Sequence, residues 1–189
     1  VRLPRFYWNF DAAAGPVVDR VSLQTAPLAP GVRRASGLVG AGAVEFNNRS
    51  DAYIDLGAAG GKEVGTGGFA VSKGVTIEAV IRPDWSGAGH STNEPLDYDE
   101  ICRKEDGIYR LLLSFQNDGG NKARQTPEVE RGPCLSFGLY RAGIGYSELD
   151  LVLDGQNGRP ALAELTDGRT HHVVATYDSW SGVKAIYID

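Results

Sequence analysis

Two carboxylates spaced two residues apart, Glu148 and Asp150, are the clearest candidates for chemistry in this sequence. They lie in the segment 148–154, Glu-Leu-Asp-Leu-Val-Leu-Asp, whose alternating pattern predicts a strand. Alternate side chains of a strand share a face, so Glu148 and Asp150 are expected to face the same way, together with Val152 and Asp154. A retaining glycosidase needs two carboxyl groups roughly 5–5.5 Å apart, and one of them protonates the leaving sugar. Hydrolysis here therefore depends on a suitably placed proton donor.

Other residue types that often carry chemistry have simpler interpretations. His171 and His172 are adjacent, so a strand sends one inside and one outside rather than both toward one metal ion. Cys102 and Cys134 fall on two predicted strands and are either a disulfide of a secreted protein or two buried apolar residues. The segment 65–70 fits the nucleotide-binding pattern Gly-x-Gly-x-x-Ala, but a strand follows it instead of a helix, so we expect no nucleotide.

Strands are the elements that must position these groups. The segment 170–189 predicts two strands joined by a turn at 178–182, with Val173, Ala175 and Tyr177 facing a buried interior. Further strands are expected at 5–10, 17–21, 42–46, 52–56, 74–83, 100–104, 108–115, 134–140, 149–153 and 161–165. We expect no helix. The pattern predicts an all-β, two-sheet antiparallel sandwich with the final hairpin at its centre.

Two of these segments resemble laminin-G-like modules of the concanavalin A-like lectin/glucanase superfamily. The segment 171–189, which reads HHVVATYD, a short turn and then VKAIYID, resembles the signature hairpin of that family. The segment 74–83, GVTIEAVIRP, is similar to the family strand Phe-Thr-Ile-Glu-Ala-Trp-Val-Arg-Pro. The resemblance implies a jelly roll formed by a single domain over 1–189. It also implies that the last strands of the family are missing, because the chain stops at Asp189.

The resemblance also bears on catalysis. Laminarinase-type hydrolases of the superfamily carry Glu-x-Asp-x-Glu or Glu-x-Asp-x-x-Glu on a strand. With Glu148 and Asp150 aligned on these motifs, the proton donor falls on Val152 or Leu153, and neither can give a proton. We therefore expect no catalytic residue and no enzyme. A glycoside hydrolase or polysaccharide lyase with an atypical acid is the alternative, and a structural spacer without a ligand is another.

Aromatic and guanidinium side chains indicate what such a module binds. Aromatic faces stack on the C–H surfaces of sugars, and charged groups fix the hydroxyls. The candidate ligand-binding residues are Trp85, Arg110, Tyr140, Arg141 and Tyr146. The expected partner is a carbohydrate or an extracellular protein, alongside other domains of a parent chain.

A calcium ion is the one cofactor that the resemblance suggests. The related pentraxin family places calcium ligands just before a strand that matches 108–115, which implies Asp106 as a ligand. Calcium favours several loop carboxylates and carbonyls, and the acidic loop around Asp97 and Asp99 is either part of such a site or simply solvated.

Composition bounds the remaining possibilities. The chain has 189 residues, of which 42% are hydrophobic and 23% charged, which is typical of a globular protein. The net charge of -5 leaves no basic stripe for nucleic acid. No apolar segment approaches the roughly 18 residues of a membrane-spanning helix, so no membrane insertion is expected. The sequence contains no Met. We therefore expect a processed piece of a larger exported protein, extracellular or periplasmic.

Overall fold

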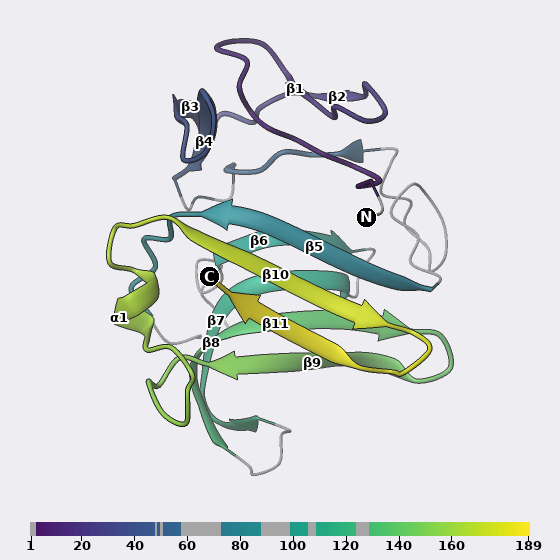
Figure 1. The fold of residues 1–189 in the computed structure, drawn as a ribbon, viewed down its shortest axis with the longest axis vertical. Helices are drawn as coiled ribbons and strands as arrows, with labels where there is room; N and C mark the ends of the chain where they lie inside the picture. Colours follow the sequence, from purple (N-terminus) through teal and green to yellow (C-terminus); the bar gives the residue numbers. More distant parts are fainter. Residues whose placement is uncertain are drawn as a thin grey trace. The chain divides into compact units, whose positions relative to one another are not determined.

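The fold is nearly all β (Figure 1). The computed structural model describes residues 3–47, 49, 51–57, 73–87, 99–105, 109–123 and 129–189. The chain divides into two compact units, Val1–Ala59 and Gly60–Asp189, and each is described here by itself. The expectation of a single domain stays a prediction.

The first unit consists of short antiparallel pairs. β1 (Val17–Val18) pairs with β2 (Thr25–Ala26), and β3 (Val32–Ser36) pairs with β4 (Gly42–Phe46). The predicted strand at 42–46 is confirmed, whereas those at 5–10 and 52–56 are wrong. In the first of these two segments, the backbone N–H of Tyr7 donates to the buried carboxylate of Asp19, 2.7 Å away, instead of to a neighbouring strand. Side-chain acceptors of this kind offer the backbone an alternative to a sheet.

Two antiparallel sheets make up the second unit. The three-stranded sheet has the order β11-β10-β5, with β5 (Gly74–Ile81), β10 (His171–Asp178) and β11 (Lys184–Ile188). The four-stranded sheet has the order β6-β7-β8-β9, with β6 (Asp99–Glu105), β7 (Tyr109–Ala123), β8 (Val129–Arg141) and β9 (Gly145–Val152). The expected final hairpin forms, but only β10 is central, because β11 is an edge strand.

One hydrophobic core lies between these two sheets. Leu135 and Phe137 of β8 and Val173 and Ala175 of β10 are fully buried in the same cluster. Tyr177 packs against it from the same face of β10. Burial of alternate residues from both sheets in one cluster confirms the predicted two-sheet antiparallel sandwich and the predicted inward face of the last hairpin.

The strand predicted at 161–165 and the expectation of no helix are both wrong, because this segment forms one helical turn, α1 (Leu162–Leu165). The Glu164 carboxylate accepts a hydrogen bond from the Ala161 N–H at 2.7 Å, which satisfies a donor at the start of the turn. Leu162 and Leu165, three residues apart, both pack against the core. No helix in the described part of the chain is long and apolar enough to span a bilayer.

Candidate functional site

The four-stranded sheet carries a group of polar side chains on its outer face, the one directed away from the shared core. Leu135 and Phe137 of β8 point into the core, so the intervening Ser136 points outward. The register places Asp150 of β9 opposite Ser136, and Glu148 opposite Gly138. The prediction that Glu148 and Asp150 share one face of a strand is therefore confirmed.

Hydrogen bonds join these side chains into an outer-face cluster of Gln116, Ser136, Tyr146, Glu148 and Asp150. The Tyr146 hydroxyl donates to Glu148 at 2.7 Å, and the Gln116 side-chain amide donates to the other Glu148 oxygen at 3.1 Å. The Ser136 hydroxyl donates to Asp150 at 2.6 Å. Both carboxylates thus act as acceptors in a network that lies largely out of water, since Gln116, Ser136 and Asp150 are all buried.

Tyr146 lies across Gly138 within this cluster. A Cβ added at Gly138 would overlap the Tyr146 hydroxyl and lie 2.5 Å from its Cζ, so the missing side chain of Gly138 makes room for the ring. Burial, and then the charge of Glu148, raise the pKa of Tyr146 far above its usual range. Tyr146 therefore stays protonated at neutral pH, as the donor that Glu148 requires.

The positions expected for a hydrolase proton donor are apolar in their surroundings as well as in type. Val152 and Leu153 are both buried. Asp154, the next carboxylate along, lies beyond the end of β9, where it forms an ion pair with Arg159 at 2.6 Å. The Arg159 hydrogen bond lowers the pKa of Asp154, which makes it a poor proton donor.

Four of the five predicted ligand-binding residues lie at one end of this sheet. The guanidinium carbon of Arg110 lies 4.3 Å from the centroid of the Tyr140 ring, and Tyr140 is the register partner of Tyr146. Arg141 is the last residue of β8. The ring of Tyr109, at the start of β7, has its centroid 6.0 Å from that of Tyr146. Three different strands therefore bring the tyrosine rings and the Arg110 guanidinium together, and these residues are half-buried.

Trp85, the fifth predicted residue, lies elsewhere. It is 5% exposed, belongs to the hydrophobic core, and its ring centroid lies 5.7 Å from that of Phe115. A ring buried in this way has no open face for a sugar. We therefore leave Trp85 out of the site and assign it to the core.

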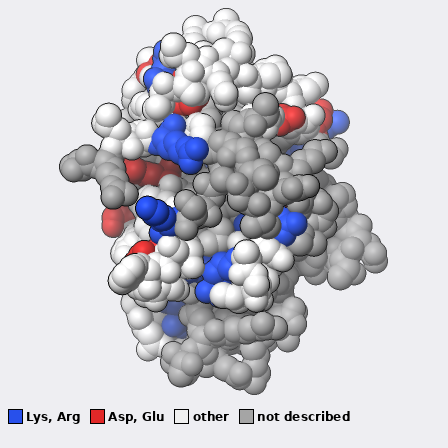
Figure 2. All heavy atoms as spheres, turned by 90° about the vertical axis from the view of Figure 1, so that its right-hand side faces the viewer, with Lys and Arg blue, Asp and Glu red and all other residues white. Residues whose placement is uncertain are grey.

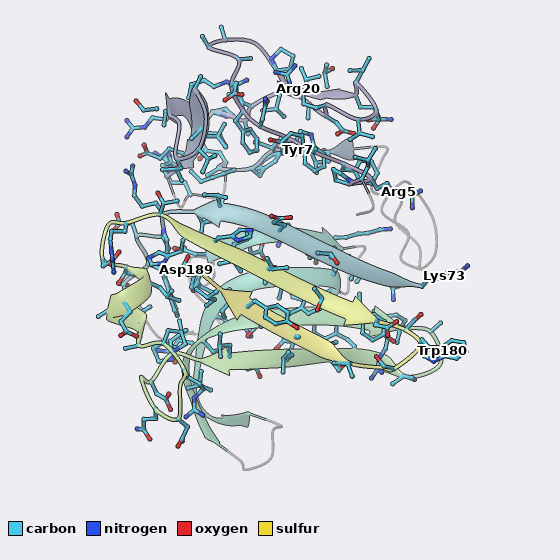
Figure 3. The ribbon with its side chains drawn as sticks, viewed as in Figure 1. Arg5, Tyr7, Arg20, Lys73, Trp180 and Asp189 are labelled. Atoms are coloured by element: carbon cyan, nitrogen blue, oxygen red, sulfur yellow. The ribbon has the colours of Figure 1, made fainter. Side chains whose placement is uncertain are left out.

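An exposed tryptophan that sequence reasoning treated only as part of a turn is Trp180. It is 96% exposed and projects from the tip of the β10–β11 hairpin (Figure 3). Asp178 holds the turn, because its carboxylate accepts hydrogen bonds from the Trp180 N–H at 3.0 Å and the Ser181 hydroxyl at 2.8 Å. A Trp between two serines in a predicted turn has no core to enter. This sequence context could have indicated an exposed ring.

The β10–β11 turn and the β8–β9 turn lie close together. Lys184, at the start of β11, donates from its Nζ to the backbone oxygen of Ser147 in β9 at 2.5 Å. We call residues 140–147 and 178–184 the hairpin end of the sandwich. Figure 2 looks at the molecule from the side of these turns, and blue basic side chains are visible among white ones.

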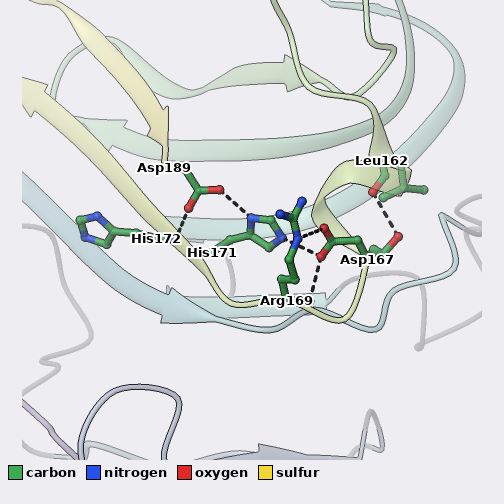
Figure 4. Close-up of polar contacts among 7 residues, drawn as sticks. Leu162, Asp167, Arg169, His171, His172 and Asp189 are labelled. Atoms are coloured by element: carbon green, nitrogen blue, oxygen red, sulfur yellow. Dashed lines mark hydrogen bonds and ion pairs between the residues drawn. The ribbon is translucent and has the colours of Figure 1, made fainter.

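A separate histidine cluster lies at the opposite end of β10 (Figure 4). His171 is buried, with Nδ1 2.7 Å from a carboxylate oxygen of Asp189 and Nε2 3.3 Å from one of Asp167. The neighbouring His172 is exposed, and its Nε2 lies 2.8 Å from Glu78. The prediction that the two rings point to opposite faces is confirmed. The cluster ties the start of β10 to the residue after β11, which is a structural role.

This cluster makes the stability of the fold depend on pH, with a loss of stability in acid. The His171 hydrogen bond lowers the pKa of Asp189, and backbone and side-chain hydrogen bonds from Arg169 lower that of Asp167. A carboxylate with a lowered folded-state pKa stabilises the fold above its unfolded pKa of about 3.9, and that contribution is lost as pH falls through the folded value. Asp189→Asn is therefore expected to lower the urea midpoint at pH 7, and the difference from wild type should shrink below about pH 3. Glu78→Gln, which removes an exposed partner, serves as the control with a smaller expected effect. A deficit that stays constant with pH would contradict this assignment.

The metal and disulfide expectations have different outcomes. Asp106 lies outside the described residues, so the calcium prediction stays a prediction. Within the described ranges, no group of three or more His, Cys, Asp or Glu side chains could hold a metal ion. Cys102 and Cys134 are not joined in a disulfide, because β7 separates their strands. The alternative interpretation fits, since Cys134 is fully buried and Cys102 packs against the core.

No protein-family model, curated protein or solved structure matches this chain. The function therefore has to be inferred from the outer-face cluster and the hairpin end themselves.

Proposed function

We propose that this chain is a non-catalytic saccharide-binding module of laminin-G-like, jelly-roll type, belonging to a larger exported protein. The observation that carries the proposal is that Arg110, Tyr140 and Tyr146 lie together on the outer face at one end of the four-stranded sheet, where Arg141 lies at the edge. Sequence reasoning selected these residues for their chemistry alone, without knowledge of their positions. Tyr140, Arg141 and Tyr146 are neighbours along one hairpin, whereas Arg110 comes from the strand before it and still lies over the Tyr140 ring.

The chemistry of this end suits a sugar ring. Tyr140 offers an aromatic face already paired with a guanidinium, and Arg110 supplies donors for hydroxyl oxygens. Glu148 accepts the Tyr146 hydroxyl proton in a hydrogen bond and so holds the Tyr146 ring in place at this end. Sugar-binding sites combine apolar stacking surfaces with a small number of positioned polar groups, and this end supplies both.

We propose no catalysis because the two carboxylates are already hydrogen-bonded and apolar residues occupy the places where a proton donor is needed. Glu148 and Asp150 already accept hydrogen bonds from Tyr146 and Ser136, and the positions expected for the proton donor are buried Val152 and Leu153. A glycosidase needs one protonated carboxyl group facing the leaving oxygen. Incubation with β-glucans and alginates, followed by a reducing-end assay, is expected to give no turnover. Turnover that Glu148→Gln abolishes would replace our proposal with the enzyme alternative.

A glycan array, probed with and without calcium, tests the binding function. The best oligosaccharide is then titrated by calorimetry against Tyr140→Ala, which is expected to weaken binding at least tenfold because the stacking face is lost. Tyr187→Ala is the matched control, since Tyr187 is an exposed tyrosine on β11 and is expected to leave affinity unchanged. Equal loss in both variants, or no glycan bound at millimolar concentration, would favour a spacer without a ligand. A requirement for calcium would support the Asp106 prediction.

A further inference from the structure

Arg141 is a basic residue with a buried donor that no described residue satisfies. Its Nε is buried and has no hydrogen-bond partner among the described residues, and no ion pair to the guanidinium occurs there. Arg34, whose Nε is also unpartnered, differs because its other nitrogens donate to the backbone oxygens of Phe10, Gly15 and Pro16. A buried donor left unsatisfied is costly, so such a group requires an explanation such as a missing water or ligand.

A second cation lies beside Arg141. Arg141 follows Tyr140 on β8 and so points to the opposite face, toward the three-stranded sheet. Lys184 of that sheet reaches the same region: its Nζ contacts the backbone oxygens of Ser147 at 2.5 Å and Phe137 at 3.5 Å. Burial, and then the charge of Arg141, lower the pKa of Lys184 to about 8. The register agrees, because Ser147 pairs with Leu139, which lies two residues before Arg141 on the same face of β8.

The surroundings leave this pair without a full counter-charge. Among the described residues, the acceptors of the Lys184 ammonium are neutral oxygens: two backbone carbonyls and the Ser147 hydroxyl at 3.2 Å. Glu148 and Asp150 favour the charged form of Lys184, and both also accept hydrogen bonds in the outer-face cluster. Two neighbouring cations at a half-buried edge, with a donor unused, attract an anion with several acceptor oxygens.

We propose that Arg141 and Lys184 form a subsite for an anionic oxygen group, a carboxylate or a sulfate, carried by the bound saccharide. The guanidinium donates to one or two oxygens of the anion, and the ammonium supplies a point charge beside it. The anionic part of this inference rests on the two basic side chains alone. The saccharide part rests on the proposed function, and places the charged substituent at the edge between β9 and β11, around the edge of the sheet from the outer-face tyrosine rings.

Inorganic sulfate at low ionic strength tests the anionic part. Nitrogen-detected NMR is expected to show saturable shifts of the Arg141 Nε–H and the Lys184 ammonium as sulfate is added. Lys184→Met keeps the apolar stem and should remove the saturable shift at Arg141, and Arg141→Gln should remove it at Lys184. Arg33→Gln lowers the net charge equally in the first unit and should change nothing, because Arg33 is already paired with Glu45 at 2.6 Å. An absence of saturable shifts in the folded wild type would overturn the inference.

Oligogalacturonate and its methyl ester test the saccharide part, because they share a sugar ring and differ in charge. Wild type is expected to bind the acid at least tenfold more tightly than the ester, and Arg141→Gln should remove the preference. Equal affinity for the two, or no binding of either, would overturn the saccharide part. A sulfate response with no glycan binding on the array would leave the anionic site standing while the proposed function fails. Glycan binding without a sulfate response would support the proposed function and overturn the anion subsite.

Discussion

Phe137→Ala is expected to lower the free energy of unfolding by about 3–5 kcal/mol, enough to leave the sandwich marginal. Phe137 is 0% exposed and lies in the middle of β8, between β7 and β9, with its ring directed at the opposite sheet. Removal of the ring leaves a cavity between two sheets, and a paired backbone ladder on both sides of β8 cannot easily collapse to fill it.

The control for this variant is Tyr187→Ala, which removes an aromatic ring of similar size from the edge strand β11. Tyr187 is 60% exposed, so its loss should cost about 0.5 kcal/mol or less. Urea unfolding monitored by far-UV circular dichroism measures both variants. Similar losses from the two would mean that the core does not lie between these sheets.

Phe137 also contacts Lys184, because the Lys184 Nζ lies over the Phe137 ring, 5.5 Å from its centroid. A less destructive change, Phe137→Leu, should therefore weaken the response of Lys184 to sulfate while the fold persists. The packing of the core and the position of the proposed anion subsite are thus coupled through one side chain.

Sequence alone predicts the strands that have one buried face, and the reason is physical. Val173 and Ala175, like Val75 and Ile77, recur every second residue because one side of each strand meets the core and the other does not. The same alternation placed Glu148 and Asp150 on one face. Where burial is not periodic, as in the four-residue α1 or the loop that carries Trp85, the pattern holds no information about direction.

The proximity of Arg141 and Lys184 is of a different kind. The two residues lie on different sheets, and their mutual repulsion depends on how the sheets stack and on which strands form the edges. Neither alternation nor spacing along the chain encodes that stacking. Sequence reasoning selected Arg141 for its chemistry and missed Lys184, because a lone Lys at the start of a strand is usually solvated.

Gly138→Ala is expected to displace Tyr146 from Glu148 and to destabilise the sandwich by about 1–3 kcal/mol. The new methyl group would overlap the Tyr146 hydroxyl, and it would lie 2.5 Å from Cζ and 2.9 Å from Cε2 of the ring. The ring has to move outward, which breaks the 2.7 Å hydrogen bond to Glu148 and exposes a buried carboxylate network to water. Under our proposal, saccharide binding should fall at least tenfold in the same variant.

Two further variants separate this clash from a general intolerance of β8 to Ala. Gly132→Ala lies in the same strand, where an added Cβ meets no atom within 4 Å, and should cost little. In Gly138→Ala/Tyr146→Ala the overlapping ring is gone, so the double variant should be no less stable than Tyr146→Ala alone. Urea unfolding of wild type, Gly138→Ala, Tyr146→Ala and the double variant gives the coupling energy between positions 138 and 146. Additive losses would show that the Tyr146 ring does not lie over Gly138, and the proposed contact between Tyr146 and a bound sugar would fail with it.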